Sequence, residues 1–186
     1  FDRTTAEPAD NPPGGVPLIM LHGWGHSINN LRGFGELLGE TGKVFLLDLP
    51  GFGDTPEPES VWGTADYADA VLRFIDQLGL GQVDLFGHSF GGRISIQLAA
   101  SHPERVRRLI LCNSAGLRLA PSFVKRIRLS AIRKTGVFLK TIDRTCGTAL
   151  FQTRFAPRFG SADYKRASGT MRNILVRTVN EDLAEF

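Results

Sequence analysis

The chain of 186 residues contains two cysteines, and it has no uninterrupted run of 18 apolar residues. Without such a run, no transmembrane helix is indicated, and the start lacks the basic-then-apolar pattern of a signal peptide. Cys112 falls in an apolar run and Cys146 in a later basic segment, so we expect two reduced, packed thiols rather than a disulfide framework. We therefore expect a cytoplasmic protein, although the first residue is Phe and a removed signal stays open.

Patterns typical of cofactor and metal sites are missing as well. The glycines at 23 and 25 and at 51 and 53 lack the G-x-G-x-x-G framework of dinucleotide sites. No phosphate-binding loop and no metal-ligand cluster is evident from residue spacing. We expect no cofactor, no metal and no nucleic-acid partner.

The net charge is +3, but the charged residues are distributed unevenly along the chain. Residues 1–117 carry 8 Lys and Arg against 14 Asp and Glu, whereas residues 118–177 carry 14 against 2. A basic block of this kind can attract acidic substrates or an anionic membrane surface. We favour a solvated outer face, with weak contact to anionic membranes left open. The sequence does not indicate the oligomeric state.

Apolar runs of buried-strand length alternate with helix-like segments. The runs lie at 16–21, 43–49, 83–86 and 106–112, and the helix-like segments at 28–40, 60–78 and 90–101. This alternation predicts an α/β fold with a doubly wound, mostly parallel sheet covered on both faces. From Leu117 onward the pattern changes to Arg-rich helical stretches without strands, and we expect Gly136 to break or kink the first of them.

The segment Gly87-His88-Ser89-Phe90-Gly91 stands where an apolar strand gives way to a helix-like run. In such a tight turn the serine backbone is strained, and side chains two residues away on either side would collide. Gly87 and Gly91 meet that need. The pattern favours Ser89 as a nucleophile, and the alternative is an ordinary helix N-cap.

Three motifs follow one another in the chain: Leu21-His22-Gly23-Trp24-Gly25, then Asp48 to Asp54, then residues 87–92. In this order they resemble the oxyanion-hole loop, the loop after the next strand and the nucleophile elbow of the α/β-hydrolase fold superfamily. The resemblance covers residues 16–116 closely, and the remainder is similar to the helical cap of many members. It implies a hydrolase core over residues 1–116 and a truncated helical cap or lid over residues 117–186.

The resemblance also assigns roles to particular residues. Ser89 would be the catalytic nucleophile, and the backbone N–H groups of Trp24 and Phe90 would form the oxyanion hole. Support for the elbow and the loop would come from Gly87, Gly91, His22 and Gly23. We expect His22 to organise its loop through side-chain hydrogen bonds rather than to transfer a proton.

In this family the acid and the histidine follow the serine in sequence. Only His102 follows Ser89, and it falls at the expected exposed end of the elbow helix. The last residues stop inside a helix-like pattern without a cap. We therefore expect a fragment whose triad acid, histidine and C-terminal strands lie beyond residue 186. Such a fragment would be inactive by itself and would expose a sheet edge beside residues 106–112.

The resulting hypothesis is a serine hydrolase that cleaves a carboxylic ester or a related small-molecule acyl substrate through an acyl-enzyme on Ser89. Carbon–carbon bond hydrolysis or perhydrolysis on the same machinery is one alternative. Another is a non-catalytic, ligand-binding member of the fold. Relatives that open epoxides or displace halide use an aspartate nucleophile, so a serine at position 89 disfavours those activities.

Overall fold

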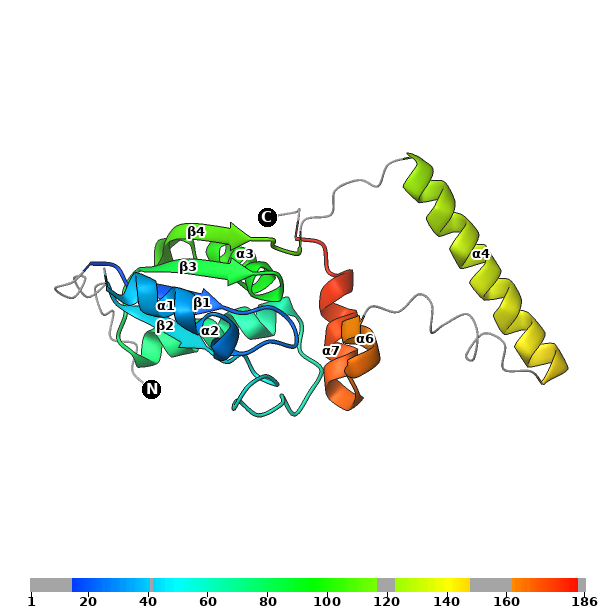
Figure 1. The fold of residues 1–186 in the computed structure, drawn as a ribbon, viewed down its shortest axis with the longest axis horizontal. Coiled ribbons are helices and arrows are strands. Elements are labelled where there is room, and N and C mark those ends of the chain that lie inside the picture. The colour runs from blue at the N-terminus through cyan, green and yellow to red at the C-terminus, as the bar shows by residue number, and fades with distance from the viewer. Residues whose placement is uncertain (1–14, 41, 117–122, 148–161, 184–186) are drawn as a thin grey trace. The chain divides into compact units, whose positions relative to one another are not determined.

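The computed structural model of this chain describes residues 15–40, 42–116, 123–147 and 162–183. Its contacts divide the chain into two compact units (Figure 1). The first unit combines Phe1–Arg118 with Ala167–Phe186, and the second is Leu119–Arg166. Residues 119–166 therefore separate two stretches of sequence that pack together.

Four parallel strands form the sheet of the first unit. They are β1 (Leu18–Leu21), β2 (Val44–Leu47), β3 (Val83–His88) and β4 (Val106–Cys112), hydrogen-bonded in the order β2-β1-β3-β4. The register places Met20 beside Leu46 on one side and Phe86 on the other. Each strand overlaps one of the apolar runs in the sequence, so the predicted parallel sheet is confirmed.

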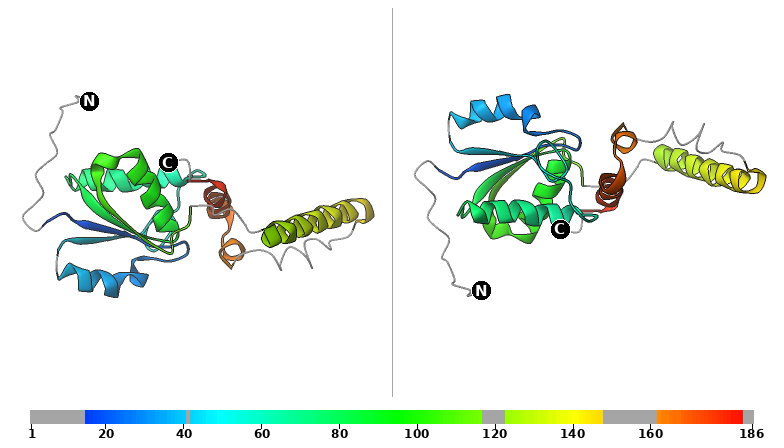
Figure 2. Two further views of the ribbon diagram at one scale, coloured as in Figure 1. Left: turned by 90° about the horizontal axis from the view of Figure 1, so that it is seen from above. Right: turned by 90° about the horizontal axis from the view of Figure 1, so that it is seen from below.

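Helices cover both faces of this sheet. The turn η1 (Ile28–Asn30) and α1 (Arg32–Gly39) lie on one face, and α2 (Thr64–Gln77) and α3 (Phe90–Ser101) lie on the other (Figure 2). The short turn η2 (Pro103–Arg105) leads from α3 into β4. This is the doubly wound α/β arrangement that alternating strands and amphipathic helices predict.

The core lies where the sheet packs against α2 and α3. Its strand and helix residues have fully buried side chains: Ile19, Leu21, Tyr67, Ile75, Val83, Leu85, Ile94 and Leu98. Burying one such aliphatic side chain contributes about 1.5–3 kcal/mol. The carboxyl ends of β1 and β3, which carry the loops of the candidate site, are therefore fixed by packing.

The strand β4 forms one edge of the sheet, as the sequence predicted. From Arg107 to Cys112 its residues are exposed, because β3 is its only partner among the described strands. The prediction of a packed thiol at Cys112 is therefore wrong. The side chain of Cys146 lies outside the described residues.

The helix α7 (Gly169–Asn180) belongs to the first unit. Its inward face buries Met171, Ile174, Leu175 and Thr178, and two of these join the core cluster. Contacts group the stretch from Ala167 onward with Phe1–Arg118, and the division into a hydrolase core at 1–116 and a cap at 117–186 stays a prediction. The apolar face of α7 explains this grouping, because it packs on the core.

The second unit contains α4 (Phe123–Cys146) and α6 (Ala162–Arg166). The helix α4 runs without a break through Gly136, so the break that we expected there is absent. A glycine inside a helix costs about 1 kcal/mol relative to alanine, which a long helix tolerates. Among the described residues no helix is both long enough and apolar enough to cross a membrane. Contact of this basic unit with anionic membranes stays a prediction.

Candidate active site

Ser89 lies between the end of β3 and the start of α3 in an unusual backbone conformation. Its φ of 50° and ψ of −106° lie outside the regions that side-chain-bearing residues normally occupy. Such strain persists only where surrounding contacts fix the backbone. The Ser89 N–H donates to Cys112 O at 3.1 Å, and Ser89 O accepts from the N–H of Ala115 at 3.1 Å. The end of β4 and the loop after it therefore hold the serine in place.

The two glycines that flank Ser89 at a distance of two residues are packed against backbone. A Cβ on Gly87 would lie 2.5 Å from Gly92 Cα, and one on Gly91 would overlap the carbonyl oxygen of Leu21. Neither neighbour is the end of a flexible side chain, so neither can move aside cheaply. The structure therefore shows the close packing that, in the sequence, suggested why both positions are glycine.

The loop after β1 lies directly against Ser89. A Cβ on Gly23 would be 3.3 Å from Ser89 Cβ, and the N–H of Gly91 donates to His22 O at 3.0 Å. Within the described part of the chain, the backbone N–H groups of Trp24 and Phe90 have no protein acceptor. These two groups are thus available to a ligand. Their role as oxyanion-hole donors stays a prediction.

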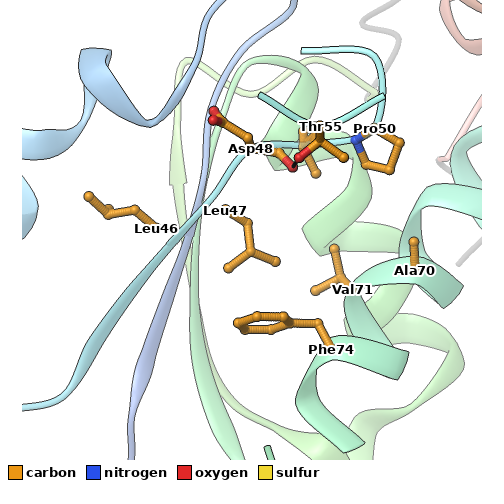
Figure 3. Close-up of a pocket in the computed structure, with 9 residues that line it drawn as sticks. Leu46, Leu47, Asp48, Pro50, Thr55, Ala70, Val71 and Phe74 are labelled. Carbon is orange, nitrogen blue, oxygen red and sulfur yellow. Dashed lines mark hydrogen bonds between the residues drawn. The ribbon is translucent and has the colours of Figure 1, made fainter. Parts of the chain in front are cut away.

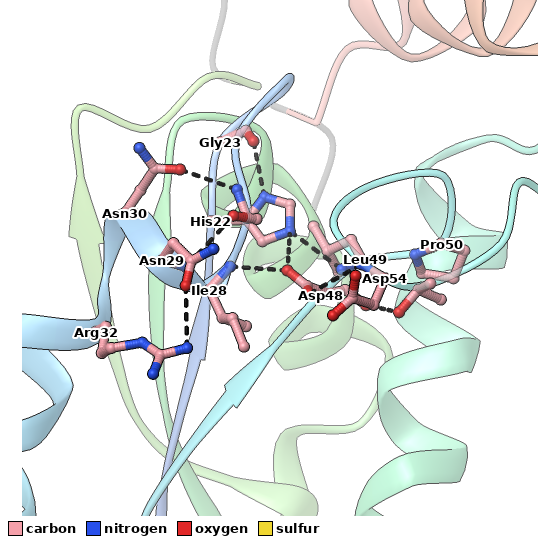
Figure 4. Close-up of polar contacts among 12 residues, drawn as sticks. His22, Gly23, Ile28, Asn29, Asn30, Arg32, Asp48, Leu49, Pro50 and Asp54 are labelled. Atoms are coloured by element: carbon pink, nitrogen blue, oxygen red, sulfur yellow. Dashed lines mark hydrogen bonds and ion pairs between the residues drawn. The ribbon is translucent and has the colours of Figure 1, made fainter.

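His22 is fully buried, and both of its ring nitrogens contact the backbone (Figure 4). Nε2 accepts the N–H of Leu49 at 3.1 Å, so the proton of the neutral ring sits on Nδ1, which donates to Gly23 O at 2.8 Å. The ring therefore joins the loop after β1 to the loop after β2. With both nitrogens occupied, His22 is not placed to accept a proton from Ser89.

Burial lowers the pKa of His22 below its ordinary value of 6.5, and this outweighs the opposing effects of the Gly23 hydrogen bond and of Asp48. The unfolded chain therefore binds a proton at this residue at a higher pH than the folded chain does. We expect the stabilising contribution of His22 to be complete above pH 6.5 and to fall as the pH drops toward the folded-state pKa.

This expectation is measured by urea denaturation of the wild-type protein and of His22→Gln between pH 8 and pH 5. The difference in free energy of unfolding between the two proteins should shrink as the pH falls through that range. A difference that stays constant would contradict the burial of a neutral His22.

Asp48 follows β2 and makes structural contacts with both of its carboxylate oxygens (Figure 4). Oδ1 accepts the N–H of Ile28 at 2.7 Å, and Oδ2 accepts the N–H of Asp54 at 3.3 Å. The backbone oxygen of Asp48 accepts the hydroxyl of Thr55 at 2.8 Å. Asp48 thus shapes the turns beside the site.

Aromatic rings pack edge to face beside the elbow. Trp24 lies 5.2 Å from Phe90 and 4.9 Å from Phe52, measured between ring centroids. The ring of Tyr67 lies 5.1 Å from Phe90, and its hydroxyl donates to Pro50 O at 3.0 Å. We did not single out Phe52 from the sequence, although its flanking glycines mark a tight turn there. The site therefore has an apolar, aromatic side next to Ser89.

The remaining histidines occupy different places. His102 ends α3, so the length of that helix, about 18 Å at 1.5 Å per residue, separates it from Ser89. This agrees with our expectation that His102 is not the base. The rings of His26 and His88 stack in parallel with centroids 5.8 Å apart. In the described ranges, no group of three or more His, Cys, Asp or Glu residues could hold a metal ion.

Two described cavities border β2 rather than the serine. One, of about 340 Å³, lies between β2 and α2 and is mostly apolar, with Leu47, Val71 and Phe74 in its wall (Figure 3). The other, of about 470 Å³, lies between β2 and α1. Ser89 lines neither of these two cavities.

Comparisons with known proteins agree with this geometry. A family profile described as alpha/beta hydrolase fold matches residues 16–135. The 2-hydroxymuconate semialdehyde hydrolase of Pseudomonas sp. (strain CF600) is 40% identical over 107 residues, which are 55% of this chain and 38% of that protein. The dihydrolipoyllysine-residue acetyltransferase component of the acetoin cleaving system of Pseudomonas putida is 36% identical over 104 residues, covering 56% and 28%.

Among solved structures, the crystal structure of a membrane phospholipase A, a bacterial virulence factor, aligns with a TM-score of 0.56 and 34% identity. That alignment covers 60% of this chain and 36% of the other. This chain thus spans less than two fifths of each of these three proteins.

Proposed function

Because this chain belongs to the alpha/beta hydrolase fold family, we propose that it carries the nucleophile of a hydrolase that cleaves a carboxylic ester or a related acyl compound through an acyl-enzyme on Ser89. The observation that carries the proposal is the strained conformation of Ser89 at a strand-to-helix turn, with glycines packed closely on both sides. An ordinary helix N-cap needs neither feature, since its backbone is typically extended.

In the proposed reaction, Ser89 Oγ attacks the acyl carbonyl and loses its proton to a general base. The negative oxygen of the tetrahedral intermediate is stabilised by the N–H groups of Phe90 and Trp24. Collapse of the intermediate releases the alcohol, which takes up the proton, and leaves the acyl group on Ser89. Water then adds to the acyl carbonyl and gives a proton to the base, and the acid is released as Ser89 Oγ takes that proton back. The apolar side formed by Trp24, Phe52 and Phe90 would receive the acyl group.

The acid and the base are the parts of the mechanism for which no residue is proposed in this chain. His22 is engaged on both nitrogens, and His102 lies at the far end of α3. Neither histidine is therefore proposed as the general base.

Carbon–carbon bond hydrolysis is the second candidate, because the relative from Pseudomonas sp. (strain CF600) at 40% identity is a 2-hydroxymuconate semialdehyde hydrolase. Both reactions would use the same serine and the same pair of N–H donors. They differ in the bond that breaks, so substrate profiling separates them.

The test is covalent labelling of the full-length protein with a fluorophosphonate probe, followed by peptide mass spectrometry. We expect one labelled peptide, modified at Ser89, because the probe reacts with serines that have an oxyanion hole and a base. Turnover of p-nitrophenyl esters of increasing chain length, compared with a ring-cleavage dienone substrate, then distinguishes ester from carbon–carbon hydrolysis. A full-length protein that binds such ligands without labelling or turnover would favour the non-catalytic alternative.

A further inference from the structure

The residues after α7 join three segments of the first unit that meet near Ser89. We use the term clasp for Arg93, Glu181 and Leu183 together with their partners Thr64 and Gly116. The Glu181 carboxylate accepts the N–H of Thr64 at 2.9 Å and also its hydroxyl, at the start of α2. The backbone oxygen of Glu181 accepts from Nη2 of Arg93 in α3. The N–H of Leu183 donates to Gly116 O at 3.1 Å.

Apart from the half-buried Glu181, the clasp is buried and closely packed. Thr64 is 1% exposed, Leu183 3% and Arg93 5%. A Cβ on Gly116 would lie 3.0 Å from Leu183 Cδ1 and 3.1 Å from Arg93 Cγ. A guanidinium is costly to bury, and hydrogen bonds must offset that cost. The side chain of Arg93 is therefore fixed to the backbone that follows α7.

A chain of hydrogen bonds leads from the clasp to the serine. The strained backbone of Ser89 is held by Cys112 O and by the N–H of Ala115. Gly116 comes next in sequence, and Leu183 of the clasp holds its carbonyl. Arg93 lies one helical turn after Ser89, and its own N–H donates to Ser89 O at 3.3 Å. The segment 112–116 thus fixes the serine, and the clasp fixes that segment.

We propose that the clasp is a positioning device for the nucleophile, in which Arg93 and Glu181 keep segment 112–116 in the place that holds Ser89 in its strained conformation. This inference rests on the proposed role of Ser89. Neither Arg93 nor Glu181 touches the reacting atoms. Loss of the clasp should let the Ser89 backbone relax, which changes the direction of its hydroxyl relative to the N–H groups of Trp24 and Phe90.

The test compares variants of the full-length protein. Arg93→Met removes the donor to Glu181 and keeps most of the side-chain volume, and Arg93→Lys is the conservative change. Arg107→Ala is the matched control, because it removes a guanidinium that contacts Asp84 at 2.9 and 2.7 Å near the amino ends of β3 and β4, away from Ser89.

We expect Arg93→Met to lower kcat for p-nitrophenyl acetate about 10-fold with KM little changed, since displacements near 1 Å cost up to about 100-fold in rate. Arg93→Lys should recover most of the loss, and Arg107→Ala should leave kcat at the wild-type value. Hydrogen exchange at the amides of Ser89 and Ala115 should be about 10-fold faster in Arg93→Met than in the wild type, because local opening becomes easier.

Wild-type kcat and exchange rates in Arg93→Met, or equal losses of kcat in Arg93→Met and Arg107→Ala, would overturn the proposal. If Arg93→Met does not fold, Glu181→Ala serves in its place: it removes the carboxylate contacts with Thr64 and with Arg177, keeps the backbone oxygen that binds Arg93, and should accelerate exchange at Ala115. A wild-type protein that is not labelled at Ser89 would instead refute the proposed function, and the exchange measurements would still decide whether the clasp fixes segment 112–116.

Discussion

Replacing Ser89 with alanine is expected to abolish ester hydrolysis by the full-length protein, with kcat falling on the order of 10⁵-fold or more. The substitution removes the only atom that can form the acyl-enzyme in the proposed mechanism. The two N–H donors stay in place, and they can account only for the weak residual catalysis that an oxyanion hole provides without a nucleophile. Initial rates with a short p-nitrophenyl ester and labelling by the fluorophosphonate probe measure the loss.

The same change should hardly alter stability, because alanine keeps the Cβ, and the backbone hydrogen bonds to Cys112 and Ala115 do not involve the hydroxyl. Ser101→Ala is the matched control, since Ser101 is an exposed serine at the other end of the same helix. We expect this control to keep full activity. Ester turnover by Ser89→Ala at the rate of the control would remove Ser89 from the mechanism.

Replacing Gly91 with alanine is expected to lower the free energy of unfolding by about 3 kcal/mol. The added Cβ would overlap the carbonyl oxygen of Leu21, which belongs to β1. That strand is paired on both sides, by β2 and β3, so its backbone cannot shift without disturbing the sheet. The change would also strain the hydrogen bond from Gly91 to His22, which fixes the loop carrying Trp24. Chemical denaturation measures the stability loss.

Gly33→Ala provides the control for this experiment. Gly33 is an exposed residue of α1, and a Cβ there would meet no atom within 4 Å. Alanine at this position should stabilise the helix by about 0.5–1 kcal/mol through its higher helix propensity. Equal free energies of unfolding for Gly91→Ala and Gly33→Ala would contradict the close packing of Gly91 in α3 against Leu21 in β1.

Sequence patterns predicted the parts of the fold that local chemistry determines. Buried parallel strands require continuous apolar runs, and the four runs became β1 to β4 in a parallel sheet. The glycines at 87 and 91 predicted a tight turn around Ser89, because only a missing side chain permits the approach that the structure shows. The expectation that His22 organises its loop came with the family resemblance. Its ring makes one hydrogen bond to Gly23 in that loop and one to Leu49 in the next.

No sequence pattern predicted the contacts between segments that are distant along the chain. Glu181 contacts Thr64 across 117 positions, and a glutamate in a polar tail looks like any solvated acid. The packing of α7 on the core cluster had no signal in the sequence, because an apolar helix face is equally suited to a cap. The exposure of Cys112 depends on which strands lie beside β4, and an apolar run in the sequence does not indicate which strands those are. Arg93 offered one hint, since it is the only Lys, Arg, Asp or Glu between Asp84 and Glu104.

The separation of the first unit into two stretches has a consequence for synthesis on the ribosome. Gly116 and Leu183, which are hydrogen-bonded partners, are 67 positions apart. At about 5–20 residues per second, roughly 3 to 13 seconds pass between the addition of one and the addition of the other. During that interval the nascent chain contains β1 to β4 while the apolar groups that α7 later covers are open to water. A chaperone that recognises apolar surface could bind the nascent chain during this interval. Slower translation of residues 119–166 would lengthen the interval.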